Sequence, residues 1–82
     1  SQNYPNPFNA GTAFSFDLPR DCNVTLKVFN LLGQLVDQPV NDYLEAGTHT
    51  IAWNPKNLSS GTYFYRLQAG TYIDIRKMTL LK

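Results

Sequence analysis

Hydrophobic and polar residues alternate along most of the chain, with the period of two that is typical of half-buried β-strands. The first two alternating segments cover residues 12–18 (TAFSFDL) and residues 23–30 (NVTLKVFN). One face of each segment carries only large apolar side chains: Phe14, Phe16 and Leu18 in the first, and Val24, Leu26 and Val28 in the second. The pattern therefore predicts a strand at each place.

Four more strands are predicted further along the chain, at residues 35–40, 48–54, 62–69 and 72–82. The third is short and contains Pro39, which lacks a backbone N–H and restricts this strand to the edge of a sheet. A helix is the competing interpretation for this segment. In the fourth strand, Trp53 is expected to be a large core residue whose indole N–H needs a partner.

The connections between these segments are rich in turn-forming residues. Pro19 to Asp21, Gly33, the loop NDYLEAG at residues 41–47 and the segment NPKNLSSG at residues 54–61 separate the first five strands. Ala69-Gly70-Thr71 predicts a tight hairpin before the last strand. Six to seven short antiparallel strands with turns between them predict an all-β fold, an immunoglobulin-like β-sandwich.

Length and composition limit this fold to one small domain. The chain has 82 residues, of which 43% are hydrophobic and 16% are charged, and these proportions favour a folded module over a disordered segment. We divide it into a Pro/Asn-rich leader at residues 1–11 and a sandwich at residues 12–82, and we expect the whole to be a module of a longer protein. No apolar run is long enough for a transmembrane helix.

Charge and candidate chemistry argue against several classes of function. The net charge of +1 gives no field that would attract nucleic acid. The chain has one cysteine, Cys22, and one histidine, His49, and its six carboxylates are dispersed. No glycine-rich phosphate loop or metal-protease motif is present. The sequence therefore predicts neither an enzyme nor a cofactor, although Asp42 and Glu45 leave a calcium site open.

Outward-pointing aromatic residues offer an alternative function. Phe29, Tyr43, Phe64 and Tyr72 are candidates for a row on which sugar rings stack. The alternative function is therefore a carbohydrate-binding or structural accessory module of a secreted glycoside hydrolase.

Five motifs, taken in order, resemble one known family. They are QNYPNPFN at residues 2–9, FNLLGQLV at 29–36, AGTHTIAWN at 46–54, SGTYFYRLQAG at 60–70 and KMTLLK at 77–82. The chain is similar to the type A carboxy-terminal sorting domains of the type IX secretion system, found on secreted proteins of Bacteroidetes. The sequence departs from the family at Ala10-Gly11, where a proline is common, and at Asn54, where aspartate is common.

The resemblance implies that the chain is the carboxy-terminal module of a larger secreted protein. It also implies a non-catalytic sorting signal that directs an attached cargo across the outer membrane. Its partners would be the type IX translocon, the associated sortase and the upstream cargo domain, with export through the periplasm to the cell surface or the medium. The residues that the resemblance marks for recognition by the translocon lie in the last two strands: Gly61, Tyr63, Tyr65, Lys77, Met78, Leu80, Leu81 and Lys82.

The leader is expected to be stiff. Pro5 and Pro7 fix their own φ angles and restrict the residues before them to extended conformations. Tyr4 and Phe8 would then pack against the edge of the sandwich and hold the cargo at a defined distance.

Overall fold

The computed structural model describes residues 3–4, 8–9 and 12–81, and the side chains of residues 13–81. Within this part the chain is all β, without a helix, and forms eight strands. They are β1 (Asn3–Tyr4), β2 (Phe8–Asn9), β3 (Thr12–Leu18), β4 (Cys22–Phe29), β5 (Leu35–Leu44), β6 (Gly47–Trp53), β7 (Gly61–Ala69) and β8 (Tyr72–Leu81).

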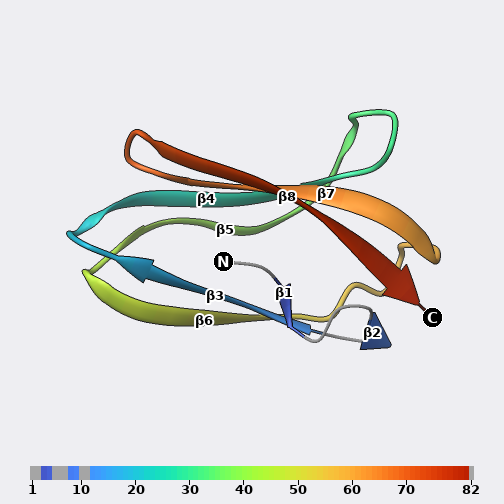
Figure 1. Cartoon of the computed structure of the whole chain (residues 1–82), viewed down its shortest axis with the longest axis horizontal. Coiled ribbons are helices and arrows are strands. Elements are labelled where there is room, and N and C mark those ends of the chain that lie inside the picture. Colours follow the sequence, from blue (N-terminus) through green and yellow to red (C-terminus); the bar gives the residue numbers. More distant parts are fainter. Residues whose placement is uncertain (1–2, 5–7, 10–11, 82) are drawn as a thin grey trace.

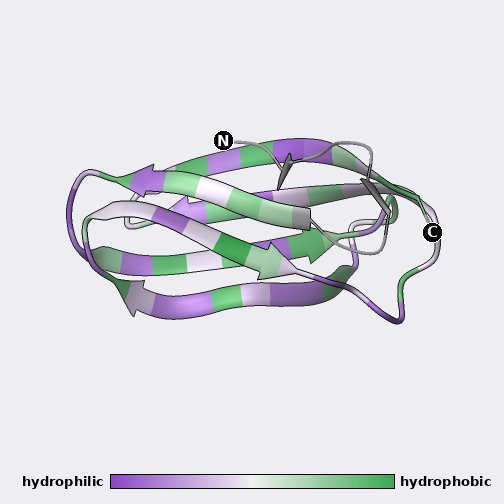
Figure 2. Cartoon of the chain, turned by 90° about the horizontal axis from the view of Figure 1, so that it is seen from below, coloured by the Kyte–Doolittle hydropathy of each residue, from purple (hydrophilic) through white to green (hydrophobic). Residues whose placement is uncertain are grey.

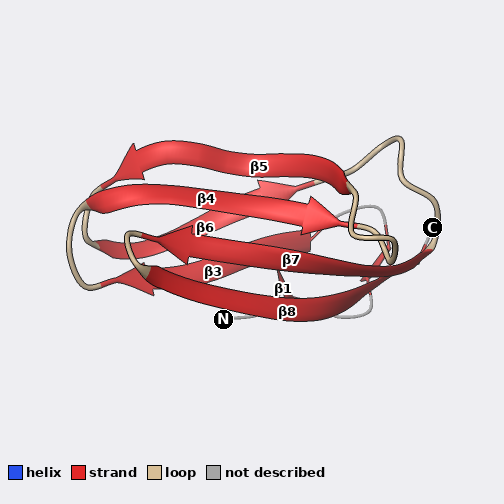
Figure 3. Cartoon of the chain, turned by 90° about the horizontal axis from the view of Figure 1, so that it is seen from above, coloured by secondary structure: helices blue, strands red, loops and turns tan. Residues whose placement is uncertain are grey.

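The strands form two sheets that face each other in a β-sandwich (Figure 1). The small sheet has the order β1-β3-β6, and the large sheet has the order β2-β8-β7-β4-β5. The four long strands of the large sheet lie side by side in the view from above (Figure 3). The predicted sandwich is confirmed, and so are the strands expected from the alternating segments.

The pairing is antiparallel with one short exception in the leader. β1 pairs antiparallel with β3, whereas β2 pairs parallel with β8, with Phe8 opposite Leu80. The two leader strands therefore join different sheets.

The prediction for β5 was partly wrong. The strand continues to Leu44, so that most of the expected loop at residues 41–47 belongs to it. Its polar composition is compatible with a strand because residues 41–43 are exposed at the edge of the sheet, and because they pair with β4. Two register shifts lie in the first half of β5, near Pro39. As expected, this proline lies in an edge strand, and the competing helix is excluded.

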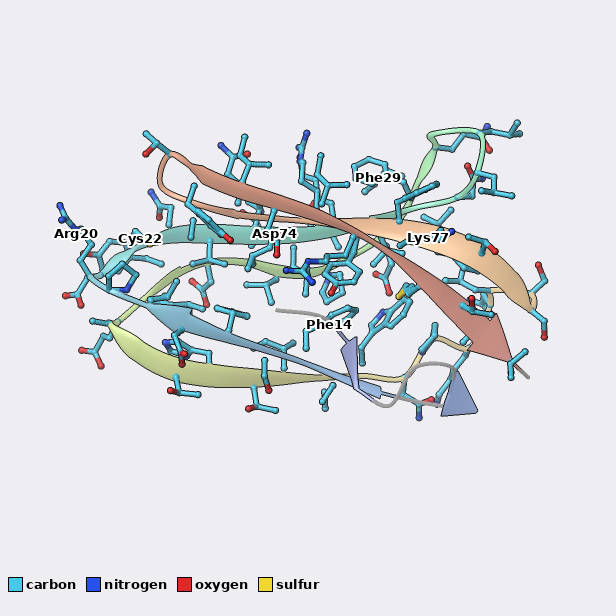
Figure 4. The ribbon with its side chains drawn as sticks, in the orientation of Figure 1. Phe14, Arg20, Cys22, Phe29, Asp74 and Lys77 are labelled. Atoms are coloured by element: carbon cyan, nitrogen blue, oxygen red, sulfur yellow. The ribbon has the colours of Figure 1, made fainter. Side chains whose placement is uncertain are left out.

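The core fills the space between the two sheets, because each long strand contributes alternate side chains to it. This alternation is visible as hydrophobic and hydrophilic bands along the strands in Figure 2. Phe14 lies between the sheets (Figure 4), with its ring centroid 4.9 Å from that of Tyr65 and 5.5 Å from that of Trp53. Trp53 is buried, as predicted, and its indole N–H donates a 2.7 Å hydrogen bond to Asp37 Oδ2.

Candidate functional site

The recognition residues expected from the sequence divide into a buried group and an exposed group. The buried group belongs to the core of the sandwich, with exposed fractions of 6%, 2%, 1% and 0%: Tyr63, Tyr65, Met78 and Leu80. These side chains are inaccessible to a partner while the domain is folded. Substitutions of these side chains are therefore expected to act on folding first.

The register of the last two strands explains this burial. β7 and β8 pair antiparallel with Tyr63 opposite Met78 and Gly61 opposite Leu80. Directly opposed residues share one face of a sheet, so the alternate residues of both strands point together into the core. The Tyr63 hydroxyl donates a 2.7 Å hydrogen bond to the Ser59 carbonyl, which satisfies its polar end.

Gly61 differs from the other residues of the motif because its backbone conformation, and not a side chain, is its distinctive feature. It is exposed at the beginning of β7 and has a φ of +152°, in a region that residues with a Cβ rarely adopt. An added Cβ would meet no atom within 4 Å, so the constraint on this position comes from the backbone angle and not from packing.

Lys77 and Leu81 form the exposed group. Both occupy the positions of β8 that alternate with the buried Met78 and Leu80, and Leu81 is 43% exposed. They therefore point away from the core, on the side of the large sheet that faces away from the small sheet. Lys82 lies outside the described residues.

The structure brings the leader and the terminal motif together at the level of the backbone. β2 pairs with residues 80–81 of β8, and β1 pairs with residues 13–14 of β3. The side chains of Tyr4 and Phe8, and both Pro5 and Pro7, lie outside the described part. The packing of the leader side chains therefore stays a prediction.

Three half-buried residues lie near Lys77: Phe29 and Phe64, which the sequence offered only for sugar stacking, and Arg66, which it did not single out. Phe29 is directly opposite Phe64, and Phe64 is directly opposite Lys77. The guanidinium carbon of Arg66 lies 5.8 Å from the centroid of the Phe29 ring, within the range of a cation–π interaction. The alternation that identified the buried residues also identifies these, since they occupy the intervening positions.

The four aromatic residues proposed for sugar stacking do not form one row. Phe29 and Phe64 are neighbours, but Tyr43 is opposite Asn23, six residues from Phe29 along β4 and therefore about 20 Å away. Tyr72 lines a cavity of about 880 Å³ at the end of the sandwich that carries the turns after β3 and β7.

The residues with possible acid–base or nucleophilic chemistry are separated in the structure. Cys22 lines the cavity beside Tyr72, whereas His49 Nε2 donates a 2.6 Å hydrogen bond to the Glu45 carbonyl. Among the described residues, no group of three or more His, Cys, Asp or Glu side chains could hold a metal ion. In the same part of the chain, no helix is long and apolar enough to cross a membrane.

Asp74 and Arg76 form an ion pair on the inner side of β8, with 3.2 Å between Arg76 Nε and Asp74 Oδ2. Figure 4 shows Asp74 toward the interior of the sandwich. Burial by itself raises the pKa of Asp74 and is the largest single influence. Hydrogen bonds and positive charge around the carboxylate, including the hydrogen bond and charge of Arg76, lower the pKa. Together they outweigh the effect of burial and hold the pKa of Asp74 below its ordinary value.

Comparison with known proteins supports the resemblance carried by the sequence motifs. Neither a curated protein nor a solved structure matches the chain. The family described as Secretion system C-terminal sorting domain matches residues 2–80, nearly the whole length. The chain therefore belongs to this family of carboxy-terminal sorting domains of type IX secretion.

Proposed function

We propose that this domain is a non-catalytic address, read by the type IX translocon in its folded state, that carries an attached cargo through the periplasm and across the outer membrane. The family supports a sorting signal that leads to the cell surface or the medium. In this proposal the translocon binds the domain, and the associated sortase acts on the cargo after export.

One observation supports recognition of the folded domain over recognition of a linear peptide. The terminal motif is interleaved with the core, because Met78 and Leu80 are buried while Lys77 and Leu81 are exposed on the same strand. A receptor that bound all these side chains as an extended peptide would first have to remove β8 from the large sheet. Such an opening would expose much of the core and cost a large part of the stability of so small a domain.

The test is export of a fluorescent protein that carries a signal peptide at its amino end and this domain at its carboxyl end. In a type IX-competent cell, the fusion is expected in the medium or at the cell surface. A twin without residues 77–82, and a twin carrying Leu80→Ala, are expected to remain in the periplasm. Retention of the intact fusion would refute the sorting function.

A fourth fusion separates folded-state from linear recognition. A peptide of residues 72–82 alone, attached to the same cargo, contains the motif without the sandwich. The proposal expects this fusion to be retained. Export as efficient as that of the whole domain would show that the translocon reads an extended segment.

A further inference from the structure

The outer side of the large sheet carries the exposed part of the terminal motif and a concentration of positive charge. We define the outer face as the side chains of β4, β7 and β8 that alternate with the buried ones, together with Leu35 of β5, which is opposite Phe29. Three cations lie on it: Lys27, Arg66 and Lys77. Lys27 is directly opposite Arg66, and Lys77 is opposite Phe64, which lies two residues from Arg66 on β7.

Among the described residues, no side-chain carboxylate lies on this face. Asp17 lies in the small sheet, where it accepts a hydrogen bond from Thr48, and Asp21 and Glu45 lie in turns. The register places the other three carboxylates with the residues that alternate toward the inner side: Asp37 opposite Val28, Asp42 opposite Val24, and Asp74 opposite Leu67. All six acidic residues belong to the described part of the chain, so a nearly neutral domain has one face that is purely cationic.

The cations lie among large apolar side chains. Ile73 is 51% exposed and Ile75 is 62% exposed, and Ile75 lies directly opposite Arg66. Phe29 and Phe64 are half-buried beside them, and Leu35 extends the row across β4. Exposed apolar groups that are gathered on one face and flanked by charge mark an interaction surface more often than isolated ones do.

Arg66 is held in place at the centre of this face. Its guanidinium lies over the Phe29 ring, and within the described structure no oxygen accepts a hydrogen bond from its buried Nε. A guanidinium fixed in this way loses little conformational freedom on binding a carboxylate. The positive charge of this guanidinium favours a carboxylate as its partner group.

We propose that the outer face is the docking surface of the domain, and that its occupant is a protein surface of the translocon that presents carboxylates together with apolar side chains. This inference rests on the proposed sorting function. A second copy of the chain is a poorer occupant because two such faces would bring like charges together. An anionic lipid surface is also poorer, because three cations are fewer than the roughly four to eight of typical lipid-binding clusters.

The test uses two kinds of change on the outer face, in the fluorescent cargo fusion. One is the double variant Lys27→Glu and Lys77→Glu, and the other is Ile75→Thr, which keeps a β-branched side chain in the strand. The matched control for charge is the double variant Arg20→Glu and Lys56→Glu, at two exposed cations away from this face. Thermal unfolding of each purified domain verifies that it remains folded.

Export is expected to fall about tenfold or more with either face variant, because binding to the translocon loses its charge or apolar complementarity. The control is expected to be exported like the original. Export of the original and of both folded face variants at equal levels would overturn the docking surface and leave the sorting function intact. Retention of the original fusion would refute the sorting function, and the docking surface with it.

A genetic selection tests the chemistry of the partner. Cells that retain the Lys27→Glu, Lys77→Glu fusion are selected for renewed export. We expect suppressors that replace Asp or Glu by Lys or Arg in a translocon protein. Suppressors confined to the domain itself would contradict an acidic protein partner. Two further results would also contradict it: binding of the purified domain to vesicles of phosphatidylglycerol and phosphatidylcholine that is lost in the face variants, or a dimer in solution that Ile75→Thr dissociates.

Discussion

Asp37 and Trp53 join the two sheets by a hydrogen bond at the β5 edge, and its contribution to stability can be isolated. Asp37 lies on β5 of the large sheet and Trp53 on β6 of the small sheet, with 2.7 Å between the indole nitrogen and Oδ2. Asp37 Oδ1 also accepts a 2.8 Å bond from the next backbone N–H, that of Gln38. Asp42, on the same strand, accepts the equivalent bond from Tyr43 at 3.0 Å. Each of the two carboxylates therefore accepts a bond from the next backbone N–H, but of the two only Asp37 also accepts a bond from the indole.

This difference makes Asp42→Ala the control for Asp37→Ala. A hydrogen bond to a charged group contributes about 1.5–3 kcal/mol. Since Asp37 remains exposed to water, we expect the lower end of this range, about 1.5 kcal/mol, as the difference in free energy of unfolding between the two variants. For a domain of this size that difference corresponds to a melting temperature roughly 6–12 °C lower for Asp37→Ala.

The assay is urea unfolding of the purified domain, followed by circular dichroism and by the fluorescence of Trp53, the single tryptophan. The dependence of unfolding free energy on urea should be the same in both variants, because the same surface is exposed on unfolding. Asp37→Asn keeps an oxygen acceptor without the charge and should lie between the original and Asp37→Ala. If Asp37→Ala and Asp42→Ala agreed within about 0.5 kcal/mol, the link between the sheets would contribute nothing measurable.

Four further predictions concern the terminal motif, the last hairpin, the ion pair and the leader. Leu80→Ala removes a fully buried side chain and should cost about 2–5 kcal/mol in urea unfolding, whereas Lys77→Ala should change stability by less than about 0.5 kcal/mol. Gly70 has a φ of +61°, which asparagine tolerates better than alanine. Gly70→Ala should therefore lower the free energy of unfolding by about 1–2 kcal/mol, and Gly70→Asn should lower it less. Equal losses of stability in the two variants would contradict a backbone cause. Because the pKa of Asp74 lies below its ordinary value, its contribution is present at neutral pH and is lost as the pH falls through the folded-state pKa. The urea midpoint of Asp74→Asn should therefore fall less than that of the original between about pH 5 and about pH 2. Deletion of residues 1–9 removes both leader strands, so it should lower the melting temperature and speed amide exchange in β3; unchanged values would contradict the docking of the leader.

The alternating pattern predicts much of this fold because burial on one side of each strand is a local property of the sequence. The segment at residues 12–18 illustrates this, since its bounds and its buried face agree with β3. The second half of β5 could not be predicted in the same way. Its strand conformation depends on pairing with β4, and an exposed edge strand tolerates the polar residues that usually indicate a loop.

The sequence identified the positions of the candidate site. It could not show which of their side chains are buried and which are exposed. The motif at residues 77–82 does not reveal which side chains are exposed until the register with β7 is known, because a shift of one residue would exchange the two faces. Nor could the sequence place Arg66 over Phe29, since these residues are separated by 37 positions and meet only when β4 and β7 pair.

Buried and exposed side chains alternate along β8, so substitutions at neighbouring positions of the terminal motif act in different ways. Substitutions at Lys77 and Leu81 can alter the outer face without opening the core, whereas substitutions at Met78 and Leu80 act on stability first. Export can therefore be lost by two routes, unfolding or failure to dock, and a deletion of the whole motif combines them. Measuring export against stability for single variants separates the routes: core variants should lose export in proportion to the unfolded fraction, and outer-face variants should lose it while remaining folded. A common dependence on stability for both sets would show that the terminal strand supports the fold and makes no direct contact with the translocon.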